Sequence, residues 1–120
     1  LTLGICIGMH VLFDYSEEDN TNCLGLIKGK IKKFKSDSQP VPQMGWNYVD
    51  GIDEFKAISN HYYFANSYYS SNTEECFGTS SYINKITSIV RKKNYIGCQF
   101  HPEKSSTAGE LFLKYFINQI

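Results

Sequence analysis

Short apolar runs alternate with polar turns along the whole chain. Leu1–Ile5 is apolar and is followed by glycines, which predicts a short buried strand. Met9, Leu12 and Phe13 then have the spacing of one helical face, so we expect a short helix from Gly8 to about Tyr15.

The middle of the chain, from Gly25 to Tyr82, has the pattern of a β-rich region. Aromatic and β-branched residues cluster between turn-forming residues there, which favours strands. We expect these strands within 28–35, 45–49, 61–69 and 76–82. The polar stretches 16–22, 35–42 and 70–75 are predicted to be loops.

The C-terminal region predicts two strands and a helix. Segments 86–94 and 95–100 read as strands around a turn at Lys93 and Asn94. Thr107–Glu110 matches a capping box that would begin the last helix. Its expected apolar face comprises Leu111, Phe112, Tyr115, Phe116 and Ile120. Helices that flank a β-rich middle predict an α/β fold.

Length and composition narrow the possible classes. A chain of 120 residues suits one domain, 1–120. Its net charge of zero argues against nucleic-acid and polybasic membrane binding, and no apolar stretch reaches the roughly 18 residues of a membrane span. The four cysteines match no zinc or redox spacing, so we expect a reducing, cytoplasmic location. Because Leu1 lies inside a predicted strand, we expect the chain to be the C-terminal part of a longer domain.

Cys6 is the first candidate for chemistry. It lies in Gly4-Ile5-Cys6-Ile7-Gly8, between a predicted strand and a predicted helix, which is the pattern of a nucleophile elbow. Small flanking residues allow the sharp, strained turn that exposes the sulfur. The helix dipole would favour the thiolate, and the Ile7 N–H would face a developing oxyanion. The simpler interpretation is a small apolar residue in a glycine-rich turn.

His101 and Glu103 are the second candidate. They are two residues apart after a buried strand, so both side chains can lie on the same side of an extended chain. A glutamate at this spacing can orient the imidazole and leave its other nitrogen free to face a thiol. Pro102 would end the strand between them, at the sheet edge where ligands bind in open α/β folds.

These motifs resemble those of class I, triad-type glutamine amidotransferases. The resemblance rests on "GICIGMH" (4–10) and "GCQFHPEKS" (97–105). Within that superfamily, "VPQMGWNYV" (41–49) and "YYFANSYY" (62–69) resemble the glutaminase branch of imidazole glycerol phosphate synthases, from histidine biosynthesis. The resemblance implies a Rossmann-like or flavodoxin-like three-layer sandwich, of which this chain would be the C-terminal portion with a β-rich insert.

The resemblance also implies a reaction and a partner. Cys6 would attack the side-chain amide of glutamine, with His101 transferring protons and Glu103 orienting it. Residues that would hold the substrate or its oxyanion are Ile7, Gly8, His10, Asn66, Ser67 and Tyr68. Ammonia would pass to a (β/α)8-barrel cyclase, which would contact Met44, Gly45, Trp46 and Asn47. Neither a metal nor an organic cofactor is needed for the glutaminase step.

Three departures from the family pattern leave alternatives open. Position 10 is usually glutamine, and the position of Asn66 is usually histidine. The family also has, ahead of the elbow, a glycine-containing loop that supplies a second oxyanion donor. A paralogue that supplies ammonia for surface-sugar amidation, a catalytically silent scaffold partner, and another cysteine hydrolase such as a γ-glutamyl peptidase are therefore alternatives.

Overall fold

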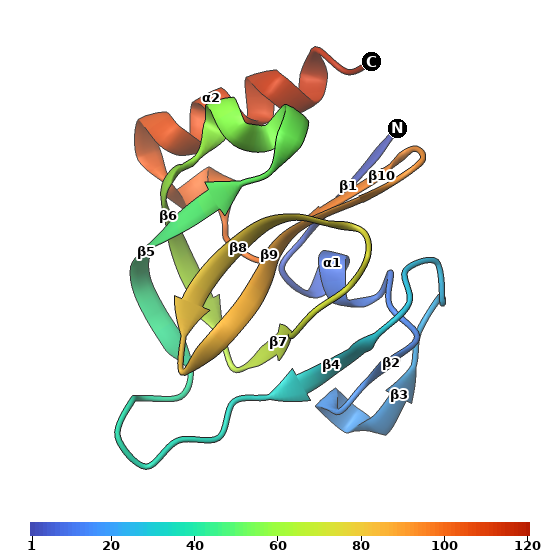
Figure 1. Ribbon diagram of the computed structural model, residues 1–120, viewed down its shortest axis with the longest axis vertical. Helices are drawn as coiled ribbons and strands as arrows, with labels where there is room; N and C mark the ends of the chain where they lie inside the picture. Colours follow the sequence, from blue (N-terminus) through green and yellow to red (C-terminus); the bar gives the residue numbers. More distant parts are fainter.

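A computed structural model describes residues 1–120, and its strands form a twisted, 10-stranded sheet (Figure 1). The strands are β1 (Thr2–Ile5), β2 (Tyr15–Ser16), β3 (Thr21–Asn22), β4 (Lys30–Lys33), β5 (Gln43–Gly51), β6 (Asn60–Asn66), β7 (Tyr68–Ser70), β8 (Cys76–Tyr82), β9 (Asn84–Lys92) and β10 (Tyr95–Cys98). The helices are α1 (Ile7–His10) and α2 (Ser106–Ile117), with 3₁₀ turns η1 (Glu18–Asn20), η2 (Asp53–Ile58) and η3 (Pro102–Lys104). This mixed α/β architecture confirms the predicted class.

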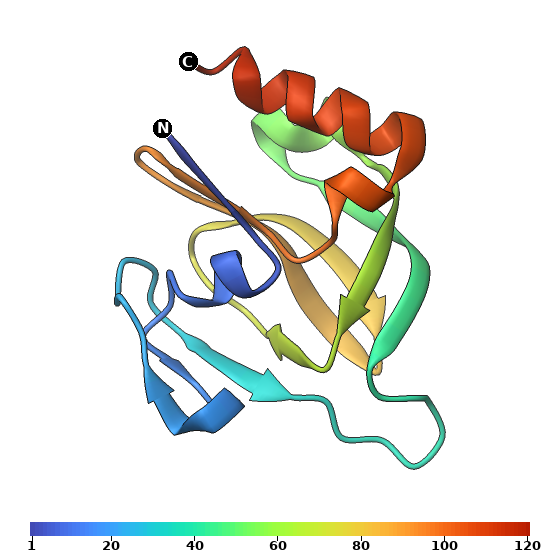
Figure 2. The same ribbon diagram turned by 180° about the vertical axis from the view of Figure 1, so that it is seen from behind.

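Strand β10 joins the two ends of the chain. It pairs in parallel with β1 and antiparallel with β9, so it lies between the first strand and the long hairpin (Figures 1 and 2). The rest of the sheet follows the order β3-β2-β4-β7-β9-β8-β5-β6. The parallel pair matters most for function, because parallel strands end at the same edge of a sheet.

Apolar side chains are buried on both faces of the sheet. Ile89 and Val90 are consecutive residues of β9 and belong to two different hydrophobic clusters. The larger cluster includes Phe112 of α2, and the smaller includes Met9 of α1. Successive residues of a strand point to opposite faces, so α2 and α1 cover opposite sides of β9 and β10.

The first helix is shorter than predicted. The sequence suggested Gly8 to about Tyr15, whereas α1 ends at His10. The carbonyls of Val11, Leu12 and Phe13 instead accept backbone hydrogen bonds from residues 24–27. Pairing with a distant segment therefore replaces the next helical turn, although the predicted apolar residues are buried.

The β-rich middle is confirmed with two corrections. The predicted loop 16–22 contains most of a small hairpin, because β2 and β3 pair around η1. The predicted strand 61–69 is broken at Ser67, where β6 ends and β7 begins. The turn at Lys93 and Asn94 lies where it was predicted, with Lys93 at a φ of 55°.

The C-terminal helix is confirmed, but its predicted cap is wrong. Helix α2 begins at Ser106, and no side chain caps it, so Thr107 and Glu110 form no capping box. The predicted apolar face is also partly wrong, because Leu111 and Ile120 are exposed. The sheet instead contacts the face that carries Ala108 and Phe112. Neither helix is long and apolar enough to cross a membrane.

Gly109 fixes how closely α2 approaches η3. A Cβ atom at this position would lie 1.8 Å from the Pro102 carbonyl oxygen. We expect Gly109→Ala to lower the free energy of unfolding by about 1–3 kcal/mol, because backbone must move, although alanine is the better helix former. Glu110→Ala, on the exposed face, is the matched control and should change it by less than about 0.5 kcal/mol. Denaturant unfolding measures both, and equal effects would contradict the close packing.

Candidate active site

Cys6 lies in a strained turn between β1 and α1. Its φ of 55° and ψ of −107° fall in a region that L-residues other than glycine rarely occupy. The backbone N–H of Cys6 donates to the Cys98 carbonyl of β10 at 2.7 Å, and the Cys6 carbonyl accepts from Met9 and His10. These hydrogen bonds hold the strain, and the predicted elbow conformation is confirmed.

The two glycines of the elbow have different roles. A Cβ atom at Gly4 would lie 2.3 Å from the Gly8 carbonyl oxygen, so the turn can close only when residue 4 has no side chain. A Cβ atom at Gly8 would meet nothing within 4 Å. The fold of this chain therefore requires the first glycine, whereas the second leaves open space beside the turn.

Burial raises the pKa of the Cys6 thiol above its usual value, and the Glu18 and Glu103 carboxylates act in the same direction. Hydrogen bonds from the Ile7 backbone N–H and the Gln99 side chain act in the opposite direction. Desolvation therefore outweighs the two hydrogen-bond donors at the start of this four-residue helix. The Ile7 N–H is thus directed at the Cys6 sulfur, and its predicted contact with an oxyanion stays a prediction.

His101 and Glu103 form the predicted pair. The His101 Nδ1 atom lies 2.9 Å from Glu103 Oε2, and because a carboxylate oxygen only accepts, Nδ1–H donates to it and Nε2 is the nitrogen left free. Ser105 fixes the backbone: its hydroxyl donates to the His101 carbonyl at 2.6 Å and accepts from the Tyr63 N–H at 2.9 Å. His101 N–H donates in turn to the Tyr63 carbonyl. The backbone that carries the imidazole is thus anchored to β6.

Cys6 lines a cavity of about 210 Å³. Its walls are formed by Cys6, Ile7, His10, Glu18, Ala65, Asn66, Ser67 and Tyr68. Five of the six residues predicted to hold substrate are among these. Gly8, His101 and Glu103 are not, so the predicted base does not line this cavity.

The Asn66 side chain is held by the protein. Its Oδ1 accepts from Gln43 at 3.1 Å, and its Nδ2 donates to the Tyr68 carbonyl at 3.0 Å. Gln43 in turn accepts from Asn47 Nδ2 at 2.9 Å. Asn66 therefore shapes the cavity wall, and Asn47 faces inward rather than outward.

The other residues predicted to contact a partner lie on β5. Met44 and Trp46 are 66% and 54% exposed, and Tyr48 continues the same outward face. Their positions alternate along the strand, so they form an apolar stripe on the outside of the sheet. Gly45 lies between them at a φ of 133°.

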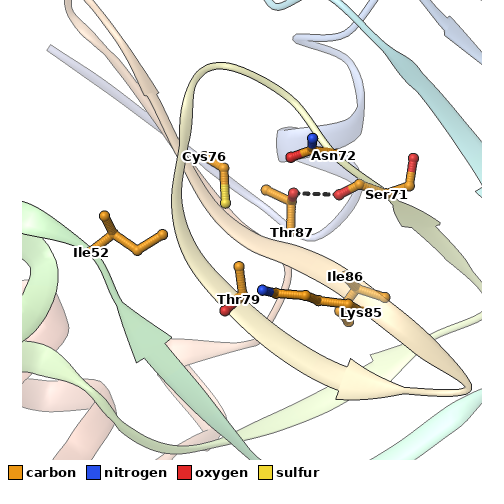
Figure 3. A pocket seen from close by; sticks show the side chains of 8 residues that line it. All are labelled: Ile52, Ser71, Asn72, Cys76, Thr79, Lys85, Ile86 and Thr87. Atoms are coloured by element: carbon orange, nitrogen blue, oxygen red, sulfur yellow. Dashed lines mark hydrogen bonds between the residues drawn. The ribbon is translucent and has the colours of Figure 1, made fainter.

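A larger cavity of about 460 Å³ lies elsewhere, over β8 and β9 (Figure 3). Lys85 and Thr79 reach into it, and Thr87 donates a hydrogen bond to the Ser71 carbonyl at its wall. Its one thiol, Cys76, is directed at the Gly78 carbonyl, and no histidine or carboxylate lines the cavity. The Cys6 cavity is therefore the better catalytic candidate despite its smaller volume.

Sequence reasoning gave no role to two residues of the site. Glu18 lies in the segment read as a polar loop, where nothing local distinguishes it from its acidic neighbours. Gln99 lies two residues before His101 in the predicted strand 95–100. The buried strand pattern of 95–100 was the available signal, because a glutamine inside it needs buried hydrogen-bond partners.

The fold, the elbow at Cys6 and the His101–Glu103 pair together define a class of protein. The similarity of the chain to known proteins agrees with this class. The model of the family described as glutamine amidotransferase class-I matches residues 2–119, so the chain belongs to this family. A solved glutamine amidotransferase superposes with a TM-score of 0.68 over 97% of this chain and 58% of that one. At 15% identity this likeness shows the fold alone.

The chain is also similar to curated proteins over nearly its whole length. It is 39% identical to the imidazole glycerol phosphate synthase subunit HisH of Haemophilus influenzae, over 98% of this chain and 62% of the relative. It is 38% identical to subunit HisH 2 of Legionella pneumophila strain Paris, over 97% of this chain and 61% of the relative. The chain thus spans about three-fifths of the length of these relatives.

The two elbow glycines give a paired test of the turn. Gly4→Ala should lower the free energy of unfolding by about 1–3 kcal/mol, because its Cβ atom would collide with the Gly8 backbone. Gly8→Ala should change it by less than about 0.5 kcal/mol, because its Cβ atom meets open space. Thermal and denaturant unfolding of both variants measure the difference. A stable Gly4→Ala variant would show that the turn does not close as described.

Proposed function

We propose that this chain carries the glutaminase site of an imidazole glycerol phosphate synthase and releases ammonia from glutamine. The observation that supports it most is the placement of two motifs at one sheet edge. Cys6 follows β1 and the His101–Glu103 pair follows β10, and these two strands are parallel and directly paired. Relatives named as subunits of that synthase support the particular branch.

The proposed reaction uses the groups already described. His101 Nε2 accepts the Cys6 thiol proton while the sulfur attacks the amide carbon of the glutamine side chain. The Ile7 N–H stabilises the resulting oxyanion. His101 returns the proton to the leaving nitrogen, the C–N bond breaks, and ammonia departs from a glutamyl thioester. Water, deprotonated by His101, then cleaves the thioester to glutamate and restores the thiol.

Glu18 suits the other end of glutamine. It is the only carboxylate that lines the Cys6 cavity. A carboxylate there complements the α-ammonium group of an amino acid, whose side-chain amide would point to the sulfur. The same negative charge helps to keep the resting thiol protonated. Substrate binding would neutralise this charge and so favour ionisation of Cys6.

The apolar stripe of Met44, Trp46 and Tyr48 is the proposed contact with a (β/α)8-barrel cyclase. Exposed aromatic and methionine side chains on one strand are typical of an interface centre. Strand β5 also pairs with β6, whose end forms one wall of the Cys6 cavity. A partner on this face would therefore lie close to where ammonia is released. We place the reaction in the cytoplasm.

Covalent labelling tests the glutaminase site. A diazoketone analogue of glutamine should add once to the full chain, in the presence of the cyclase, and Cys6→Ala should abolish the adduct. Intact mass and peptide mapping measure both. Cys23→Ala is the matched control and should label normally, because Cys23 lies outside the Cys6 cavity. An adduct that persists in Cys6→Ala, or no adduct at all, would overturn the proposed function.

The stripe gives a separate test of the partner. Trp46→Ala should weaken binding of the barrel cyclase by roughly tenfold or more, because a large aromatic anchor is lost from the interface centre. Leu111→Ala, equally exposed but on α2, should leave the affinity unchanged. Calorimetry or surface binding measures both affinities. Equal affinities for Trp46→Ala and the unaltered chain would place the interface elsewhere.

A further inference from the structure

Two buried polar side chains beside Cys6 have no part in the reaction described above. Gln99 is fully buried just after β10, and His10 is 4% exposed at the end of α1. A buried amide and a buried imidazole each cost free energy unless they are hydrogen-bonded. Their partners are each other and the sulfur of Cys6.

The three groups form a chain of hydrogen bonds with a defined direction. Gln99 Nε2 lies 3.6 Å from Cys6 Sγ, and Gln99 Oε1 lies 2.7 Å from His10 Nε2. An amide oxygen only accepts, so His10 Nε2 must carry the proton that it donates. Gln99 then presents its NH₂ group to the sulfur.

We propose that Gln99 is a catalytic hydrogen-bond donor that stabilises the Cys6 thiolate, and that His10 is a positioning residue that fixes the Gln99 amide in the donating orientation. This inference rests on the proposed role of Cys6 as nucleophile. Gln99 would then be a third hydrogen-bond donor to the sulfur, besides the Ile7 N–H and the His101 imidazole once it is protonated.

The orientation of the amide decides which form of the sulfur is favoured. If the Gln99 amide turned over, its oxygen would face Cys6 and accept from the thiol, which favours the protonated form. That state would also require an unprotonated His10 Nε2, with the proton on Nδ1. His10 Nδ1 is buried and has no hydrogen-bond partner, and a buried N–H without an acceptor is rare. The imidazole therefore selects the orientation in which Gln99 donates.

Charge does not drive this selection. Burial lowers the pKa of His10 below its usual value, so the ring is neutral at physiological pH. The charged groups that act on Cys6 are Glu18 and Glu103, and both oppose ionisation. The amide donor of Gln99 is thus one of the few influences that favour the thiolate in the absence of substrate.

The test measures the ionisation of Cys6 directly. In the full chain, the rate of Cys6 alkylation by iodoacetamide is followed against pH, with peptide mapping to separate Cys6 from the other cysteines. Gln99→Met has similar length but no donor, and it should raise the apparent pKa of Cys6 by about one unit, which means roughly tenfold less thiolate. His10→Phe should shift it in the same direction by less.

His10→Gln is the rescue variant. A glutamine amide can donate to Gln99 Oε1 as the imidazole does, so the alkylation profile should return toward that of the unaltered chain. An unchanged Cys6 pKa in Gln99→Met, even with reduced thermal stability, would show that Gln99 is only structural. A His10→Gln profile as shifted as that of His10→Phe would overturn the positioning role.

A measurement on the unaltered chain covers the case in which a variant fails to fold. Nitrogen-15 spectra should show His10 protonated at Nε2 and unprotonated at Nδ1, and the Gln99 side-chain NH₂ signal should shift as Cys6 ionises. The opposite tautomer of His10, or a Gln99 NH₂ signal that does not shift when Cys6 ionises, would refute the proposal. Neither readout needs glutamine or the cyclase, so a failed glutaminase assay would leave this result separate.

Discussion

The parallel pairing of β1 with β10 is the constraint on which the rest of the site depends. Ile5 pairs with Cys98, and the next N–H, that of Cys6, donates to the Cys98 carbonyl. This register brings together residues that are more than ninety positions apart in the chain. Both motifs then leave the sheet at the same edge. Local structure within either motif could not bring the two together.

Close backbone packing converts that pairing into a fixed geometry. The elbow closes because Gly4 has no side chain against Gly8, and α2 approaches η3 because Gly109 has none against Pro102. Ser105 then links the backbone of His101 to β6. The Gly4 contact and the backbone hydrogen bonds of Cys6 hold its strained conformation, whereas the Gly109 and Ser105 contacts fix the segment that carries His101.

The electrostatics of the site favour a resting thiol. Burial and two carboxylates raise the pKa of Cys6, while the Ile7 N–H and the Gln99 amide oppose them. The net effect of these groups is to favour the protonated form of the Cys6 thiol. A cavity that holds its own acid, Glu18, makes ionisation sensitive to a cationic ligand.

The sequence alone determined the local motifs. Gly4-Ile5-Cys6-Ile7-Gly8 predicted the elbow, and His101-Pro102-Glu103 predicted the imidazole–carboxylate pair, because a few adjacent residues fix backbone conformation and side-chain spacing. Most strands of the middle were likewise predicted from their aromatic and β-branched content. The tertiary structure decided where α1 ends, which face of α2 is buried, and that Glu18 and Gln99 adjoin the sulfur. Contacts with distant segments fixed each of these features. Residues 24–27 donate hydrogen bonds to the carbonyls that would otherwise extend α1. Burial within the fold likewise has the largest effect on the pKa of Cys6, and local sequence does not reveal it.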